Sequence, residues 1–332
     1  MGRLKTARSY HTATLLRNGK VLVAGGYSGA MGSVVLASTE LYDPASDRWS
    51  DAAPMLAPHA SHSAGLLPDG KVLIASGRSS NGDTTAAEIY DPGANAWKLA
   101  GDLAVARVNS QAIVLANGRV VVIGGDGGAT PPAELYDPGL NAWSKVPNTS
   151  TSHVNVAASL RNGKVLILGG QLAWTYDPNS NSVSSVAPPP ALLHAATVLG
   201  DGRVLLVGSL DPSLALIAEL YDPVANRWSF AAAMEPNGVW GTATALPDGR
   251  VLVAGSPVSA GGAGCGPDVR CFDAEVYDPA KNVWTLTAGM ATSRGEHTAT
   301  LLTNGKVLVA GGSLPPNPDM TASAEIFDPF GG

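Results

Sequence analysis

The sequence predicts an all-β protein made of seven similar units, each a sheet of four antiparallel strands. Two observations support this prediction. A turn of the type Asn/Asp-Gly-Lys/Arg, flanked by runs rich in Leu, Val and Thr, recurs seven times at intervals of 39 to 56 residues. Each turn is followed by a Tyr-Asp-Pro or Phe-Asp-Pro motif, and in five units a Trp follows the Tyr by seven residues. Because units of this size bury their faces against one another, we expect all 332 residues to form one closed domain.

The first two strands of a unit are clearest in residues 11–26, which read His-Thr-Ala-Thr-Leu-Leu-Arg-Asn-Gly-Lys-Val-Leu-Val-Ala-Gly-Gly. Asn18-Gly19 supplies two residues that tolerate positive φ, which predicts a two-residue type I′ turn and a tight hairpin. Gly25-Gly26 then allows the chain to leave the second strand without a Cβ clash. The same turn begins at Asn18, Asp69, Asn117, Asn162, Asp201, Asp248 and Asn304.

The third strand of each unit ends at an aromatic residue, and the fourth strand carries a Trp in most units. The Asp-Pro pair after the aromatic residue predicts a tight turn, because Pro restricts φ. A Trp at one register predicts a wedge between neighbouring sheets, so we expect the Tyr and Trp side chains in the core. The aromatic residues are Tyr42, Tyr90, Tyr136, Tyr176, Tyr221, Tyr277 and Phe327, and the fourth-strand residues are Trp49, Trp97, Trp143, Val183, Trp228 and Trp284.

The last of the seven units is short, because it reaches Gly332 before a fourth strand. We expect either that a short segment around Gly2 to Lys5 pairs with this unit or that its sheet has three strands, and we favour the N-terminal pairing. The seven units span approximately residues 8–57, 58–106, 107–151, 152–190, 191–237, 238–293 and 294–332.

The order of a double Gly, a Tyr and a Trp in each unit resembles the kelch repeat, and the resemblance covers residues 8–329. It implies a seven-bladed kelch-type β-propeller with four antiparallel strands per blade, named A to D here in chain order. Closing such a ring removes most exposed sheet edges, which is one reason why a chain of small sheets adopts it.

The composition argues against nucleic acid and membrane partners. The net charge is −6, charged residues make up 14% of the chain, and Lys and Arg form no cluster that could neutralise phosphates. No run of 18 apolar residues occurs, so the sequence predicts no membrane-spanning helix. The first residues, Met-Gly-Arg-Leu-Lys, do not form a signal peptide as written. We expect a monomer that does not insert into a membrane.

Cys265 and Cys271 are the two cysteines, and both lie in one Gly-rich loop. We expect them to form a disulfide, which favours a secreted, periplasmic or cell-surface location over the cytoplasm. Two free thiols are the alternative interpretation. No His or third Cys lies close by in the sequence, so the pair does not indicate a zinc site.

One face of the ring is expected to carry the function. The A–B and C–D turns are short, whereas the B–C loops and D–A connections vary and share the opposite face. The residue before the first-strand His differs in every unit, and three positions before that His an Arg recurs in three units. The arginines either hydrogen-bond loop carbonyls or bind an anionic ligand, and Trp240 either stacks on a ligand or plugs the channel. The predicted ligand-binding residues are Arg8, Tyr10, Arg107, Asn109, Trp240, Arg294 and Glu296.

Four histidines, His11, His62, His194 and His297, occupy one register at the start of strand A. Three of them belong to contiguous blades, so a metal cluster near the channel mouth is one interpretation. The favoured interpretation is structural, because side chains at this register should face the neighbouring blades. We therefore predict neither a metal nor another cofactor.

The favoured function is binding of a protein segment, a glycan or a small-molecule ligand on the B–C/D–A face around the central channel. The sequence shows no nucleophile elbow, no paired catalytic carboxylates and no phosphate-binding Gly-rich loop, so the catalytic residues of any reaction stay unknown. The alternative is an enzyme that acts on a small molecule or sugar at the same mouth, with Glu296, His153, Asn109 and the arginines as candidate acid–base groups. Related kelch propellers include sugar mutarotases and nitrile-forming specifier proteins, which is an analogy of fold only.

Tyr10-His11 also resembles the Tyr-His pair at the copper site of galactose oxidase, a seven-bladed kelch-type enzyme. The resemblance implies an axial Tyr and an equatorial His. That family cross-links a second Tyr to a Cys, and no Cys occupies the equivalent register here. Its remaining His ligand comes from a C-terminal domain without a counterpart in this sequence. Copper radical oxidation is therefore the least favoured alternative.

Overall fold

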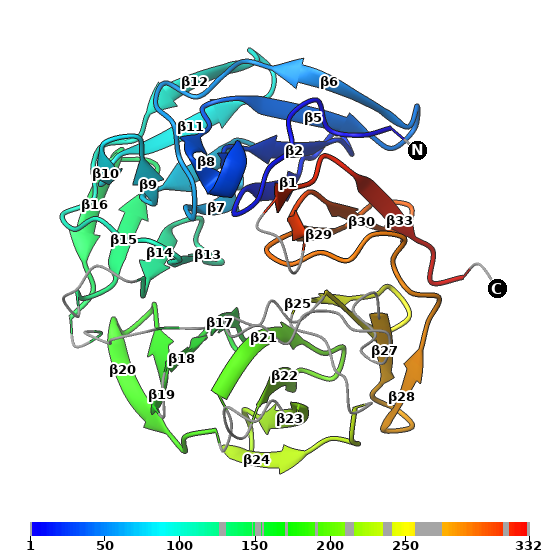
Figure 1. Cartoon of the computed structure of the whole chain (residues 1–332). Helices are drawn as coiled ribbons and strands as arrows, with labels where there is room; N and C mark the ends of the chain where they lie inside the picture. Colours follow the sequence, from blue (N-terminus) through cyan, green and yellow to red (C-terminus); the bar gives the residue numbers. More distant parts are fainter. Residues whose placement is uncertain are drawn as a thin grey trace.

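Seven small sheets surround a central axis, so the first and last blades are neighbours (Figure 1). The computed structural model describes residues 2–125, 131–147, 149, 154, 156–169, 172–189, 192–209, 216–234, 241–255, 274–314 and 319–330. The predicted seven-bladed β-propeller is confirmed, with antiparallel pairing in every blade. Among the described residues, no helix is long and apolar enough to cross a membrane.

Blades 1 to 3 each contain four strands in the order A to D. Blade 1 contains β1 (Thr12–Leu15), β2 (Val21–Ala24), β5 (Thr39–Asp43) and β6 (Arg48–Ala52). Blade 2 contains β7 (Ser63–Leu66), β8 (Val72–Ala75), β11 (Ala87–Asp91) and β12 (Ala96–Leu99). Blade 3 contains β13 (Gln111–Val114), β14 (Val120–Ile123), β15 (Glu134–Asp137) and β16 (Ala142–Lys145).

Blades 4 to 6 repeat this order, and blade 7 has three strands. Blade 4 contains β17 (Val156–Ser159), β18 (Val165–Gly169), β19 (Leu172–Asp177) and β20 (Ser182–Val186). Blade 5 contains β21 (Leu192–Val198), β22 (Val204–Ser209), β23 (Leu216–Asp222) and β24 (Arg227–Phe230). Blade 6 contains β25 (Gly241–Ala245), β26 (Val251–Gly255), β27 (Ala274–Asp278) and β28 (Val283–Leu286). Blade 7 contains β29 (Thr298–Leu301), β30 (Val307–Ala310) and β33 (Ala324–Phe327).

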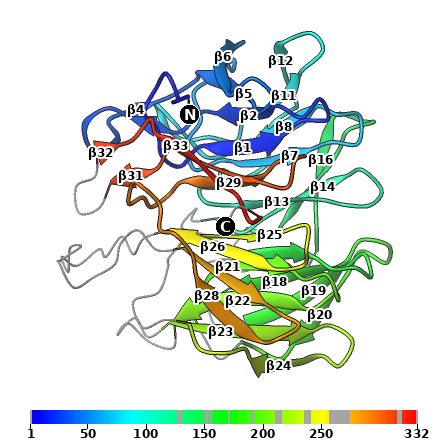
Figure 2. The same ribbon diagram turned by 90° about the vertical axis from the view of Figure 1, so that its right-hand side faces the viewer.

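Among the described residues, three B–C loops form short hairpins of their own. These are β3 (Tyr27–Ser28) with β4 (Val34–Val35), β9 (Arg78–Ser79) with β10 (Gly82–Asp83), and β31 (Ser313–Leu314) with β32 (Asp319–Met320). A 3₁₀ turn, η1 (Ala30–Gly32), lies in the first of these loops and contacts β32 of the last. The labelled strands β4, β31 and β32 lie together at one side of the ring in Figure 2. The B–C loops of blades 1 and 7 therefore meet on the loop face.

The A–B turns are tight, but they are not the two-residue type I′ turns that the Asn-Gly pairs predict. In the first turn, Gly19 has a φ of 81°, whereas Asn18 is not among the residues with positive φ. Gly19 N donates to Leu16 O at 3.0 Å, and Leu16 N donates to Lys20 O at 2.8 Å. This is a three-residue loop in which a type I turn leads into a left-handed Gly. The Asn18 side chain accepts the Lys20 N–H at 3.1 Å, which explains the preference for Asn or Asp here.

The cores lie between blades, where the predicted aromatic wedges are confirmed. Every residue of β2 is buried, as is every residue of β8. The Tyr90 and Trp97 rings pack 5.1 Å apart, and Trp97 contacts the cluster that contains Leu22 and Met55 of blade 1. Trp97 Nε1 donates to Ala53 O at 2.8 Å, just after strand D of blade 1. Each fourth-strand Trp thus joins its own blade to the preceding one.

The N-terminal residues close the ring without adding a strand to blade 7. Leu4 N donates to Ala322 O at 2.9 Å, a bond that Met55 N repeats with Ala37 O in the next D–A connection. Leu4 is buried in the core between blades 7 and 1. The prediction of four strands is confirmed for blades 1 to 6. The favoured strand pairing at the N-terminus is wrong, because this segment follows the path of a D–A connection, and the described blade 7 has three strands.

Candidate functional site

Four residues that lie two positions before strand A form a ring segment at the channel mouth. Tyr10, Ser61, Asn109 and Glu296 have φ values of 52°, 50°, 60° and 55°, a left-handed conformation that is unusual for residues other than Gly. Their backbones are linked in series across blades 7, 1, 2 and 3. Tyr10 N donates to Glu296 O at 3.2 Å, Ser61 N to Tyr10 O at 3.0 Å, and Asn109 N to Ser61 O at 2.9 Å. The predicted candidates Tyr10, Asn109 and Glu296 are thereby brought together with Ser61.

These residues surround a cavity of about 230 Å³. Its polar groups are hydroxyls, amides, imidazoles and one carboxylate, so it offers both hydrogen-bond donors and acceptors. The cavity is smaller than most drug-sized pockets, which suits the end group of a longer ligand. It is lined by Tyr10, His11, Ser61, His62, Asn109, Ser110, Gln111, Glu296 and His297.

Tyr10 and Glu296 form the link between blades 1 and 7 at this mouth. The Tyr10 hydroxyl donates to Glu296 Oε1 at 2.5 Å, and Ser313 Oγ donates to the other carboxylate oxygen at 2.9 Å. Burial raises the pKa of Tyr10 above its ordinary value, and the bond to Glu296 raises it further. The phenol therefore keeps its proton. Tyr10 is 38% exposed, and its ring meets the Tyr27 ring edge-on at 5.8 Å.

Three of the four strand A histidines, His11, His62 and His297, face neighbouring blades, as the structural interpretation predicts. His62 Nε2 lies 2.9 Å from Thr12 Oγ1 of blade 1, and His11 Nε2 lies 3.0 Å from Thr298 Oγ1 of blade 7. Burial lowers the pKa of His62 to about 3 and that of His297 to about 4, so both rings are neutral near pH 7. Within the described ranges, no group of three or more His, Cys, Asp or Glu side chains could hold a metal ion.

Arg8 lies inside the protein and not at the mouth. Its side chain is 0% exposed, and Nη1 donates to Gly25 O at 2.7 Å and to Ser38 O at 3.0 Å. Nη2 forms an ion pair with Glu40 at 2.8 Å. This arrangement agrees with the first of the two predicted roles, hydrogen bonding to loop carbonyls. The guanidinium has no surface that a ligand could reach.

Arg107 and Arg294 repeat this arrangement in blades 3 and 7. Both are 0% exposed, and each pairs with the Glu of its own third strand, Glu134 and Glu325 respectively. We therefore withdraw the three arginines from the candidate ligand-binding set, because burial prevents contact with a ligand. In blade 2, His59 takes the same place and lies 3.5 Å from Glu88.

The repeated Glu before the Tyr is the residue that sequence reasoning missed. Glu88 accepts the backbone N–H groups of Leu56 and Ala57 at 2.7 and 2.8 Å, and thereby holds the D–A connection. Glu40 and Glu134 each do the same for two backbone N–H groups. The signal was present in the sequence, since an acidic residue at one register in six units is unusual for a buried strand.

Blade 5 breaks this pattern. Glu219 is buried, and neither carboxylate oxygen has a hydrogen-bond partner in the described part of the chain. The positions that donate N–H groups in the other blades are Pro188 and Pro189 here, and Ala191 stands at the position of the Arg. Because Pro has no N–H, the carboxylate loses these donors. Burial raises the pKa of Glu219 to about 7.

Several predicted residues lie outside the described residues. These are Trp240, Cys265, Cys271 and His153, and the side chain of His194. The disulfide and the role of Trp240 therefore stay predictions.

Comparisons with known proteins agree with this architecture. Residues 7–56, the first unit, match the family model of the Kelch motif. No curated protein matches the chain. Among solved structures, the chain is similar to a fungal alcohol oxidase of the AA5 family in complex with copper, with a TM-score of 0.79 and 18% identity, over 99% of this chain and 75% of that one. At this identity the similarity shows the fold alone.

Proposed function

We propose that this chain, a seven-bladed β-propeller of the kelch type, is a binding module that holds the end of a ligand at the channel mouth. The observation that carries this proposal is the ring segment Tyr10, Ser61, Asn109 and Glu296, four non-Gly residues in left-handed conformation. Such strain costs roughly 1 kcal/mol or more for each residue and clusters at functional sites. Side chains of four successive blades converge on one cavity there.

A hydroxyl-rich ligand, such as the end of a glycan, fits this cavity best. Asn109 and Gln111 each supply an amide with donor and acceptor atoms, and Ser61 supplies a hydroxyl. Tyr10, whose ring the Tyr27 ring meets edge-on, lines the cavity and offers an aromatic side chain to the apolar face of a sugar ring. Because Arg8 is buried, its guanidinium does not provide a positive charge at the mouth for an anionic ligand.

The alcohol oxidase similarity does not extend to a copper site at Tyr10 and His11. The His11 ring is buried and its Nε2 faces Thr298 of blade 7, while the Tyr10 hydroxyl donates to Glu296. The His, Cys, Asp and Glu side chains of the described ranges form no group of three that could hold a metal ion. The residues present do not fit copper, and we derive no oxidation step from this site.

Binding to a glycan array and to a peptide array tests the proposed function. We expect glycan binding that Asn109→Gly weakens at least about ten-fold, which corresponds to about 1.4 kcal/mol. Asn141→Gly is the matched control, because Asn141 has a left-handed φ of 50° at a C–D turn on the opposite face. The control should unfold at a lower temperature than Asn109→Gly, because it also removes the 2.7 Å hydrogen bond that the Tyr136 hydroxyl donates to Asn141. It should nevertheless bind as the original chain does.

Other outcomes separate the alternatives. Binding of peptides that depends on Asn109 and Glu296, without binding of glycans, would keep the binding module and overturn the glycan as its ligand. Silence on both arrays together with turnover of a small molecule that depends on Glu296 would overturn the binding module in favour of an enzyme.

A further inference from the structure

The cavity at the channel mouth has a net negative charge. Among the described residues that line it, the ionisable groups are Tyr10, Glu296 and the imidazoles of His11, His62 and His297. Burial lowers the pKa of each imidazole, to about 3 for His62 and to about 4 for His297, so all three rings are neutral near pH 7. Burial raises the pKa of Tyr10, so its phenol keeps the proton. The Glu296 carboxylate is therefore the charged group of this cavity.

The described partners of Glu296 are neutral. Its Oε1 accepts a hydrogen bond from the Tyr10 hydroxyl, and its Oε2 accepts one from Ser313 Oγ at 2.9 Å. Within the described part of the chain, Glu296 forms no ion pair. Each carboxylate oxygen has two lone pairs, so each can accept one further hydrogen bond. Both the charge and part of the hydrogen-bonding capacity of Glu296 are therefore left for a ligand.

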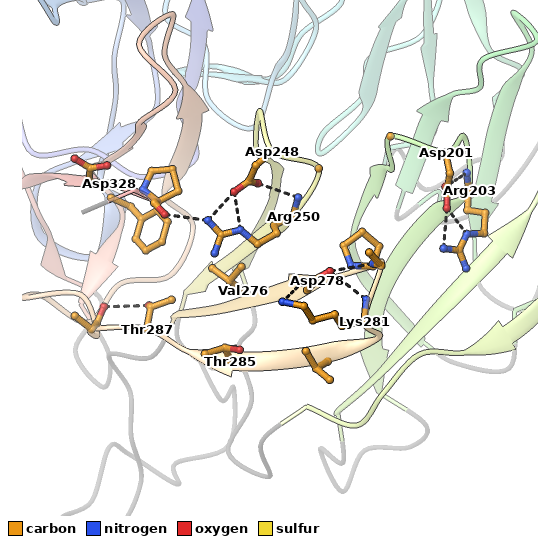
Figure 3. A pocket seen from close by; sticks show the side chains of 18 of the residues that line it. Asp201, Arg203, Asp248, Arg250, Val276, Asp278, Lys281, Thr285, Thr287 and Asp328 are labelled. Atoms are coloured by element: carbon orange, nitrogen blue, oxygen red, sulfur yellow. Dashed lines mark hydrogen bonds and ion pairs between the residues drawn. The ribbon is translucent and has the colours of Figure 1, made fainter. Parts of the chain in front are cut away.

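The arginines of the neighbouring blades do not compensate this charge, because each pairs with an acidic residue of its own blade. These pairs are Arg8 with Glu40, Arg78 with Asp83 and Arg294 with Glu325. Charges are also paired on the opposite face, in a cavity of about 1300 Å³ (Figure 3). The pairs there are Asp201 with Arg203, Asp248 with Arg250 and Asp278 with Lys281. Glu296 differs from these carboxylates, since its described partners are hydroxyl groups.

The ring segment has different chemistry at its two ends. Glu296 is at one end and Asn109 at the other, with Tyr10 and Ser61 between them in the series of backbone bonds. A cation beside Glu296 would also meet the partly exposed Tyr10, whose ring attracts positive charge through its π face. Asn109 and Gln111 supply neutral amides, which suit hydroxyl groups. The mouth therefore offers a cation site next to a hydroxyl site.

We propose that the mouth selects a glycan whose terminal sugar carries a free amine, with the ammonium group against Glu296 and Tyr10 and the hydroxyls against Asn109 and Gln111. The inference rests on the proposed function and names the ligand class within it. An ammonium group has N–H donors and no acceptor, so it matches the remaining lone pairs of the carboxylate. Such a charge-assisted hydrogen bond is roughly twice as strong as a neutral one. An acetylated amine or a hydroxyl in the same place lacks this charge.

Calorimetry with the full chain and three matched sugars tests the proposal. The β-1,4-linked trimers of glucosamine, N-acetylglucosamine and glucose differ only in the group on C2, which is an amine, an acetamide and a hydroxyl respectively. At slightly acidic pH, where the amine is protonated, we expect the glucosamine trimer to bind at least about ten-fold more tightly than the other two. Spermidine, which has the same number of amines and no sugar ring, should bind more weakly than the glucosamine trimer.

Two variants test whether Glu296 causes the preference. Glu296→Gln removes the charge and keeps the size of the side chain, so the ratio of the affinities for the glucosamine and glucose trimers should fall at least about five-fold. Asp319→Asn is the matched control, because Asp319 is an exposed carboxylate of β32 in the same blade and does not line the cavity. It should leave the ratio unchanged, since solvent and salt screen an exposed charge. The comparison of the trimers uses the original chain, so it decides the question even where a variant does not fold.

The outcomes separate this inference from the proposed function. Equal or tighter binding of a neutral trimer, or no binding of any trimer while the array shows other glycans bound, would overturn the inference and leave the binding module in place. An unchanged ratio in Glu296→Gln would also overturn it, because a group other than Glu296 would then hold the amine. Spermidine that binds as tightly as the glucosamine trimer would do the same, since charge alone would then explain binding. Absence of binding to the trimers and to the glycan array would overturn the glycan as the ligand, and this inference with it.

Discussion

His62 Nε2 lies 2.9 Å from Thr12 Oγ1, across the boundary between blades 2 and 1. The same relationship joins His11 to Thr298, and a longer contact of 3.4 Å joins His297 to Thr242. Each of these His side chains therefore connects its blade to the preceding one beside the channel. The ring is thus held by polar contacts near its axis as well as by Trp wedges farther out.

The burial of His62 makes the free energy of unfolding depend on pH below about pH 6.5. Burial lowers the pKa of His62 from its ordinary value of 6.5 to about 3. The unfolded chain therefore binds a proton at higher pH than the folded chain, and stability falls as the pH drops from about 6.5 towards 3. We expect His62→Gln to reduce the slope of the unfolding free energy against pH in this window by about one proton. Urea unfolding at several pH values measures the slope. An unchanged slope would show that His62 is protonated in the folded chain.

Glu219 should act in the opposite direction, between about pH 4.5 and pH 7. Its pKa is raised from 4.5 to about 7 by burial, so the folded chain holds the proton more tightly than the unfolded chain. Stability therefore falls as the pH rises from about 4.5 to about 7 and then levels off. We expect Glu219→Gln to stabilise the protein at pH 8 by about 1–3 kcal/mol and to have little effect at pH 4.5.

The matched control for this variant is Glu134→Gln. Glu134 pairs with Arg107 at 3.1 Å and accepts two backbone N–H groups, so its loss should destabilise the protein at pH 8 by about 3 kcal/mol. Urea unfolding of both variants measures the difference. If Glu219→Gln instead destabilises the protein at pH 8, the Glu219 carboxylate must have a hydrogen-bond or ion-pair partner in the folded protein.

The number of blades, the strand order and the aromatic wedges could be predicted from the sequence because they repeat. A period that returns seven times determines which residues share a register, and a repeated Trp must pack against the neighbouring copy. Turn geometry was harder to predict. Asn18-Gly19 is compatible with two hairpin loops, and the choice depends on whether Asn18 takes positive φ, which local composition does not determine.

The candidate site could be predicted only in part. Tyr10, Asn109 and Glu296 were identified because they vary at a register where the repeat is otherwise regular, and the structure does bring them together. Arg8 lies only two residues before Tyr10, yet its side chain is buried against Glu40, which is 32 residues away in the chain. A contact over this separation depends on how the D–A connection folds over strand C, and no local pattern encodes it.

The buried arginines give a third prediction. Arg107→Ala leaves Glu134 buried without its cation, so we expect a loss of about 3–5 kcal/mol in the free energy of unfolding. Arg107→His should cost less, because His59 occupies this position in blade 2 and contacts Glu88 there. Chemical denaturation measures both. Equal losses would show that an imidazole cannot replace the guanidinium at this position, contrary to the parallel with His59. A large loss of ligand binding with little change in stability would instead return Arg107 to the binding site.

The first double Gly gives the fourth prediction, which tests how closely neighbouring blades approach. A Cβ on Gly25 would lie 2.2 Å from His59 O, a backbone atom of the connection to blade 2 that cannot move without disturbing the Arg8 and His59 contacts. Gly25→Ala should therefore destabilise the protein by at least about 3 kcal/mol, through both the clash and the strain of its positive φ of 63°. Gly163→Ala is the matched control, because Gly163 also has positive φ but its Cβ would meet no atom within 4 Å. Its cost should be about 1 kcal/mol, from backbone strain alone. Thermal and urea unfolding of the two variants measure this difference. Equal costs would mean that blades 1 and 2 are less tightly packed than the Gly25 to His59 approach indicates.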